Sequence, residues 1–220
     1  CGPVVGYNAV YVDALGTYYH CSKEPAALEA LQRAALFHAS VLWPDGSPVA
    51  CIDERQIYHG GATTGNVGFS WSPEGRGFLL QQLALYAGSN GRLVSGDYAA
   101  SMLLYGGDGE VVMPPSSSDV FARMLDADRM LIRRDAPWQW AMAGYACEIS
   151  TSRWIQDRQN LVDVYHDALG LVIGGGQTKL QPLWSTFTVG DTSLLCHTEG
   201  DETPDFRPDI DLLWTPTTAR

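Results

Sequence analysis

The sequence has no long apolar run and few positive charges. Nothing in it approaches the roughly 18 consecutive apolar residues that a membrane-spanning helix needs, so it predicts no membrane span. Its 14 Lys and Arg residues stand against 25 Asp and Glu residues, which gives a formal net charge of −11. Nucleic acids and anionic membrane surfaces bind clustered Lys and Arg. The charge balance therefore argues against both as partners, although it leaves room for a local basic cleft.

Motifs for metals, phosphates and redox pairs are also missing. The five cysteines form no CxxC pair, and no HxH or HExxH pattern occurs, so we expect no metal and no cofactor. The glycines at 174–176 are not followed by the Lys-Ser/Thr of a phosphate loop. We interpret the cysteines as buried free thiols. In an oxidising compartment we expect at most one bridge, and Cys21–Cys51 is the pair that we favour.

The chain starts at Cys1, which allows three explanations. The protein is a fragment of a longer chain, or Cys1 carries a lipid, or Cys1 is an N-terminal nucleophile. A nucleophile of this kind uses its own α-amino group as base, and its fold would place strands next, whereas a helical pattern begins at Tyr7. We favour the fragment, for a reason that follows from the resemblance described below.

The 220 residues are 45% hydrophobic and 18% charged, enough apolar mass for one large domain or two small ones. A helical stripe runs from Tyr7 to Tyr18, and a second apolar face from Leu28 to Ala39 follows Ser22, a candidate cap, and Pro25. Ser72-Pro73-Glu74 predicts another helix start. Two further short helices are expected, over residues 97–105 and 119–126.

The pattern changes after residue 127. Aromatic and branched residues then gather in short runs separated by Gly, Pro and Asp, as in strands. We expect strands within residues 130–132, 138–149, 160–173 and 183–189. The prediction is an α+β fold, with antiparallel helical hairpins over residues 1–127 and an antiparallel sheet over residues 128–220.

Between Trp43 and Pro73 the chain makes a connection far longer than the ordinary 4 to 6 or so residues. It contains Asp53, Glu54, Tyr58 and His59 ahead of a glycine-rich stretch, and it has too many apolar residues for disorder. We interpret it as a structured loop that lines a functional site, in preference to a lid over the core.

Several segments follow one another in a layout that a known family shares: Gly6–Tyr19 with Ala27–Leu31 and the Pro44-Asp45-Gly46 turn, the glycine-rich loop, the helix containing Gly75, and Asn160–Asp167 with Leu169–Gly176. This layout resembles that of heparinase II/III-like polysaccharide lyases. The resemblance implies an (α/α) toroid joined to a β-sandwich, a secreted or periplasmic location, and a polysaccharide or oligosaccharide as partner. A full toroid has roughly twice the helices expected here, which is why we favour a fragment that acts with the remainder of a longer chain.

Lyases of this kind remove the proton beside a uronate carboxylate and eliminate the 4-linked sugar. That proton is not acidic until a donor offsets the carboxylate charge, and a base and an acid must then lie within hydrogen-bond reach. The resemblance thus implies proton transfer by Tyr58 and His59 and charge neutralisation by Asn8 and Arg76. The expected substrate-binding residues are Asn66, Trp71, Glu74 and His166.

Each candidate also has a structural interpretation. Asn8 is a capping or solvent-facing residue, Asn66 serves a turn, and Arg76 pairs with Glu74 or with a loop carbonyl. Tyr58 packs beside a His59 that is bonded to backbone. For His166 we favour a satisfied core or rim histidine over a metal ligand.

Two other functions stay open. A glycoside hydrolase on the same scaffold would use two carboxylates placed about 5 to 9 Å apart, from among Asp53, Glu54, Glu74 and Glu148. The acidic charge balance suits the neutral sugar of such an enzyme. A non-catalytic carbohydrate-binding module would use some of the seven Trp and ten Tyr for stacking.

Overall fold

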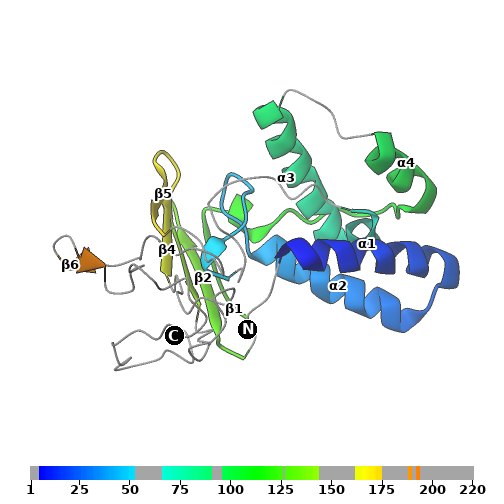
Figure 1. Cartoon of the computed structure of the whole chain (residues 1–220), viewed down its shortest axis with the longest axis horizontal. Helices are drawn as coiled ribbons and strands as arrows, with labels where there is room; N and C mark the ends of the chain where they lie inside the picture. The colour runs from blue at the N-terminus through cyan, green and yellow to red at the C-terminus, as the bar shows by residue number, and fades with distance from the viewer. Residues whose placement is uncertain are drawn as a thin grey trace, which may run out of the picture. The chain divides into compact units, whose positions relative to one another are not determined.

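The computed structural model describes residues 5–52, 66–90, 96–125, 127–143, 162–174, 188–189 and 192–193. The chain forms two compact units, residues 4–48 with 60–121, and residues 1–3 and 49–59 with 122–220. The first, the helical unit, contains every α-helix of the described residues, and the second, the sheet unit, contains the β-strands, of which the first begins just before the boundary. Figure 1 shows both units.

The helical unit begins with an antiparallel hairpin of α1 (Val5–Ser22) and α2 (Pro25–Ser40), as expected. Pro25 lies in the first turn of α2, but the cap residue is Glu24, whereas Ser22 is the last residue of α1. The Ser22 hydroxyl accepts the Glu24 N–H at 3.2 Å, so it stabilises the link and does not cap α2. Ser22 as the helix cap was a wrong prediction.

The end of the long connection, from Asn66 onward, folds into the core of the helical unit. It forms the short helix η2 (Val67–Trp71), whose Phe69 is fully buried with Val12, Leu31 and Phe78. The backbones of α1 and η2 touch at Gly16 and Gly68, because a Cβ at Gly16 would lie 2.4 Å from the Gly68 Cα. The connection also contains η1 (Ala50–Ile52), which belongs to the sheet unit.

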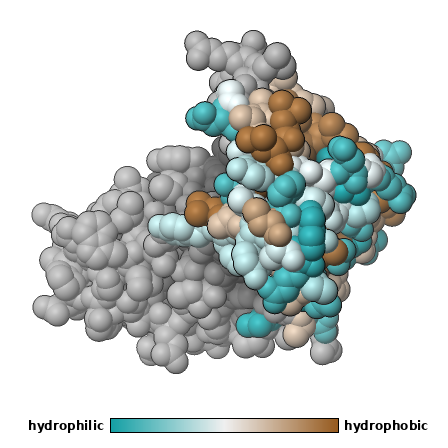
Figure 2. Space-filling view, turned by 90° about the vertical axis from the view of Figure 1, so that its right-hand side faces the viewer, coloured by the Kyte–Doolittle hydropathy of each residue, from teal (hydrophilic) through white to brown (hydrophobic). Residues whose placement is uncertain are grey.

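Three more helices complete the helical unit: α3 (Pro73–Asn90), α4 (Gly96–Tyr105) and η3 (Pro115–Ser117). The Ser72 hydroxyl accepts the Gly75 N–H at 3.0 Å, so the predicted cap of α3 is confirmed. Helix α4 has no buried residue, and Leu103 is 88% exposed. Figure 2 shows brown apolar surface between teal polar patches on the face of the molecule that it presents.

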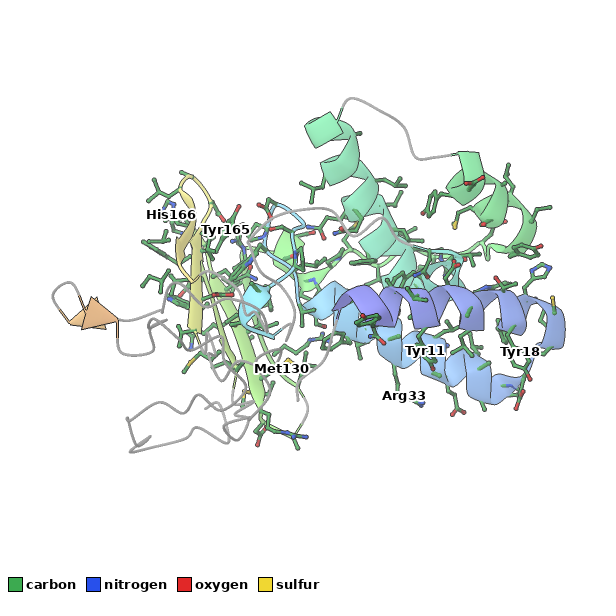
Figure 3. All side chains as sticks on the ribbon, viewed as in Figure 1. Tyr11, Tyr18, Arg33, Met130, Tyr165 and His166 are labelled. Atoms are coloured by element: carbon green, nitrogen blue, oxygen red, sulfur yellow. The ribbon has the colours of Figure 1, made fainter. Side chains whose placement is uncertain are left out.

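The apolar stripe of α1 faces the other way from the expectation. Tyr7, Val10, Tyr11 and Tyr18 are exposed, and the buried side of α1 carries Val12 and its neighbours along the helix. Helix α1 is apolar on both sides, and so the spacing of its apolar residues alone could not identify the inner face. Figure 3 labels Tyr11 and Tyr18 along this helix.

The sheet unit is a meander in which five consecutive strands lie in the order β1-β2-β3-β4-β5. These strands are Val120–Leu125, Met130–Asp135, Trp138–Ala143, Val162–His166 and Gly170–Ile173. The pairs from β2 to β5 are antiparallel, and a separate antiparallel pair joins β6 (Thr188–Val189) to β7 (Thr192–Ser193). The α+β class with an antiparallel sheet is thus confirmed.

Strand β1 corrects one prediction, the helix over residues 119–126. Its residues alternate between exposed and half-buried along the strand, which is the period of two of a strand and not the period of a helix. A segment of about seven residues fits both patterns, so pairing with β2 decides its structure.

One face of this sheet is buried and partly polar. It presents Met130 and Ile132 from β2, Ala141 from β3, and the fully buried polar residues Gln139 and Asp163. The Asp163 carboxylate accepts the backbone N–H of Cys51 at 2.8 Å and so fixes η1 to β4.

Candidate functional site

Asn8 lies on α1 and binds a histidine of α2. Its side-chain amide Nδ2 is 3.0 Å from the His38 Nε2, and Asn8 itself is half-buried. An amide nitrogen carries two N–H groups, and the bond to His38 uses one of them. The residue is therefore neither a helix cap nor fully solvent-facing, and its amide is held in a defined orientation.

His38 is held neutral by its surroundings. It is 1% exposed, and its ring makes edge contacts with Phe37, Phe69 and Phe78 at centroid distances of 5.4, 4.9 and 5.7 Å. Burial lowers the pKa of His38 to about 4, because an imidazolium ion would lose its hydration in this aromatic cage. At neutral pH the ring thus offers Nε2 as an acceptor to the Asn8 amide.

Asn66 and Arg76 hold the backbone of the helical unit. The buried Asn66 side chain donates its Nδ2 hydrogen to the Ala9 carbonyl oxygen, and its backbone carbonyl accepts the Phe69 N–H. Arg76 donates from Nη1 to the Ser70 carbonyl and from Nε to the Glu110 carbonyl. The interpretation of Arg76 as a partner of loop carbonyls fits these contacts, which use two of the five N–H groups of its guanidinium group.

Trp71 lies in an aromatic cluster at the far end of α1. Tyr19 meets its ring edge-on at a centroid distance of 4.9 Å, and the His20 ring lies 6.1 Å away. The Lys23 ammonium lies 4.3 Å from the Trp71 ring centroid, and His20 also packs edge-on against Tyr105 at 5.4 Å. Trp71 is thus part of a mixed aromatic and cationic surface.

Glu74 lies on an open groove between α2 and α3. The groove has a volume of about 550 Å³ and is lined by Glu29, Gln32, Arg33, Leu36, Pro73 and Glu74. Figure 3 labels Arg33 on α2. The lining thus combines two carboxylates, one guanidinium and one amide with two apolar side chains.

His166 belongs to the sheet unit. It is half-buried on β4, its ring meets Trp138 edge-on at 4.6 Å, and its Nδ1 accepts the Ala168 N–H at 3.1 Å. Among the residues that the structure describes, no three His, Cys, Asp or Glu side chains form a group that would hold a metal ion. These contacts fit the interpretation of His166 as a satisfied rim histidine.

Several candidates fall outside the described residues: Tyr58, His59, Asp53, Glu54 and Glu148. The proposed proton-transfer pair therefore stays a prediction. Neither of the described cysteines, exposed Cys21 and buried Cys51, forms a disulfide, so the bridge that we favoured between them is absent from the structure, and the interpretation as a buried thiol is wrong for Cys21. Burial, followed by the charge of Asp163, raises the pKa of the Cys51 thiol well above its usual value.

The structure adds His38 and Lys23, which the sequence did not single out. A histidine on the apolar face of a helix, between Ala35 and Ala39, was the available signal for His38. No comparable signal marked Lys23, because its contacts come from η2, far along the chain.

No helix of the described ranges combines the length and the apolar character that crossing a membrane requires.

In comparisons with known proteins, no protein-family model matches this chain, and no curated protein and no solved structure matches it either.

Proposed function

We propose that this chain is part of a polysaccharide lyase that cleaves uronate-containing chains by β-elimination. The proposal includes an (α/α) toroid and a β-sandwich in the complete protein, to which the helical hairpin and the antiparallel sheet would contribute. In this reaction the proton at C5 leaves, a C4–C5 double bond forms, and the bond to the 4-linked oxygen breaks. The leaving oxygen takes up a proton.

The orientation of the Asn8 amide is the observation that carries this proposal. Elimination needs a hydrogen-bond donor aimed at the uronate carboxylate, where negative charge builds up as the proton leaves. Neutral His38 accepts one amide hydrogen of Asn8, which leaves the second N–H for such a carboxylate. A donor that is fixed before the reaction loses little free energy to reorganisation.

Tyr58 and His59 supply the proposed proton transfer. A tyrosine hydroxyl and an imidazole are common acid–base groups, and each typically contributes about 10² to 10⁴-fold to a rate. Arg76 is a weaker candidate than the sequence indicated, because bonds from Nε and Nη1 to two backbone carbonyls hold its guanidinium group and use two of its five N–H groups. We therefore assign charge neutralisation to Asn8 alone.

The test is turnover of uronate-containing polysaccharides by the full chain or its longer parent. The product of elimination absorbs in the ultraviolet through its new double bond. Tyr58→Phe should lower kcat by about 10²-fold or more with little change in KM, because the hydroxyl acts only as the proton moves. Tyr11→Phe is the matched control, since it removes a hydroxyl from an exposed residue of α1. Equal activity of both variants would contradict the assignment.

A second candidate function, glycoside hydrolysis, is favoured by the groove that contains Glu29 and Glu74. Two carboxylates facing one sugar would serve as acid and base or nucleophile. A hydrolase would release reducing ends without ultraviolet absorbance, and Glu74→Gln or Glu29→Gln would abolish that release. A binding module would give neither signal.

A further inference from the structure

Lys23 occupies a backbone position that usually belongs to glycine. It follows the last residue of α1 with a φ of 55°, and its N–H donates to the Tyr19 carbonyl at 2.9 Å, which closes the helix end. The left-handed conformation costs an L-residue about 1 to 2 kcal/mol, so glycine is the usual residue here. A lysine at such a position points to a function for its side chain.

The side chain lies over two aromatic rings. The ammonium is 4.3 Å from the centroid of Trp71 and 5.3 Å from that of Tyr19. Within the described ranges no carboxylate pairs with it, and the neighbouring Glu24 carboxylate instead accepts the Tyr18 hydroxyl hydrogen. The rings thus hold the ammonium in place, and no acidic partner for its N–H groups occurs among the described residues.

Two ring nitrogens of the same cluster also lack partners. Trp71 Nε1 and His20 Nδ1 are buried and make no hydrogen bond to any described group. Buried polar atoms in native proteins almost always have a partner, and leaving one without a partner is costly. The cluster that holds the Lys23 ammonium therefore contains two ring nitrogens whose hydrogen bonding the described residues leave unmet.

Lys23 is also the cation of the helical unit with the fewest competing contacts. The described part of this unit has three cations, Lys23, Arg33 and Arg76. Arg76 is bound to carbonyls, and Arg33 shares its groove with two carboxylates. An anionic sugar that approaches a protein with a charge of −11 needs a local positive site, and Lys23 provides one.

We propose that Lys23, Trp71 and His20 form a subsite for the anionic group of a sugar unit, either a carboxylate or a sulfate. The ammonium would bind the anion through charge-assisted hydrogen bonds, and Trp71 would hold the ammonium in place. Along α1 the subsite lies roughly 20 Å from Asn8, at about 1.5 Å per residue. It would therefore hold a unit several sugars away from the reacting one. The identity of the polymer rests on the proposed function.

The test uses calorimetry to measure the affinity of the full chain for three oligosaccharides of equal length. One carries only carboxylates, one carries sulfates, and one is neutral. Lys23→Met should weaken binding of an anionic oligosaccharide about 5- to 30-fold, and the anion that is affected more identifies the group. The neutral oligosaccharide should bind unchanged. Arg133→Met, which removes an exposed charge from the sheet unit, is the matched control and should change nothing.

Lys23→Gly separates binding from the helix cap. It relieves the left-handed backbone, so it should leave the protein at least as stable while it weakens anion binding as much as Lys23→Met does. The subsite is wrong if the chain binds neither anionic oligosaccharide, if Lys23→Met changes anion affinity less than 2-fold, or if Arg133→Met causes the same loss.

The same measurements distinguish a failure of the proposed subsite from a failure of the proposed lyase reaction. Elimination product from the wild-type chain, together with unchanged affinity in Lys23→Met, would refute the subsite and leave the lyase proposal in place. Lys23-dependent anion binding without elimination product would refute the lyase proposal and support the subsite.

Discussion

The two units bury different chemistry. The helical unit encloses aliphatic and aromatic side chains around Phe69 and Phe78, and its buried polar side chains, such as His38 and Gln82, are neutral. The buried face of the sheet unit contains two residues of ionisable type, Asp163 and Arg134, beside Gln139 and its apolar residues. An apolar core tolerates small shifts of its helices, whereas buried ionisable groups must meet specific partners. The helical unit should therefore depend on packing volume and the sheet unit on individual polar contacts.

The largest effect should come from a cavity in the helical unit. Phe69→Ala removes a fully buried ring that touches both His38 and Phe78, so it should lower the free energy of unfolding by about 3 to 5 kcal/mol. Urea denaturation measures the loss. Leu103→Ala is the control, because Leu103 is almost fully exposed, and it should change stability by less than about 0.5 kcal/mol. Similar losses in both variants would refute the core described above.

Sequence reasoning identified these helices better than their buried faces. The starts at Pro25 and Pro73 followed from local chemistry, namely a proline in the first turn and, before Pro73, a serine cap. The inner face of α1 did not follow, because this helix is apolar on both sides and only its contacts with α2 and η2 decide which side is buried. Local signals thus fixed helix ends, and tertiary contacts fixed orientation.

The candidate site also depends on contacts between distant parts of the chain, which local sequence signals do not predict. The contacts of Arg76 with backbone carbonyls fit the structural interpretation made from the sequence. The Asn66 side chain instead bonds to the Ala9 carbonyl of α1, 57 positions away, and the turn interpretation did not anticipate this contact. The partner of Asn8 is 30 positions away on another helix, so no spacing rule could name His38. Lys23 and Trp71 are still further apart in the chain than Asn8 and His38, so no spacing rule could place Lys23 over the Trp71 ring.

The next effect is a pH dependence that belongs to the helical unit. The pKa of His38 is about 4 in the folded protein and about 6.5 in an unfolded chain. Below pH 6.5 the unfolded chain binds a proton that the folded protein does not, so stability falls as the pH drops from about 6.5 to 4. The full difference corresponds to about 3 kcal/mol, at about 1.4 kcal/mol per pH unit.

Urea denaturation at several pH values measures this dependence. His38→Gln removes the titrating group and keeps a side chain that can accept a hydrogen bond from Asn8. Its stability should vary less than that of the wild-type protein between pH 6.5 and 4. The same slope in both proteins would mean that His38 is not held neutral in the fold.

The smallest effect tests a polar contact of the sheet unit. Arg134 donates two hydrogen bonds to Asp167, from Nη1 to Oδ1 at 2.7 Å and from Nη2 to Oδ2 at 2.9 Å. The bonds to Arg134 are the main reason that the pKa of the Asp167 carboxyl lies below its usual value, with a smaller contribution from His166. The pair therefore stabilises the fold above the usual pKa of an aspartate, and this contribution is lost as the pH falls through the lowered pKa.

Asp167→Asn should lower the free energy of unfolding by about 0.5 to 1 kcal/mol at neutral pH, because Asp167 is exposed and water screens its charge. Asp135→Asn is the matched control, since Asp135 is an exposed acid at the end of β2, and it should have no effect. The loss should shrink at high salt and disappear at a pH below the lowered pKa, where the carboxyl is already protonated. A loss that stays constant across salt and pH would show that Asp167 acts through the shape of the β4–β5 turn and not through its charge. The proposed contrast between a volume-dependent helical unit and a contact-dependent sheet unit would then fail at this pair.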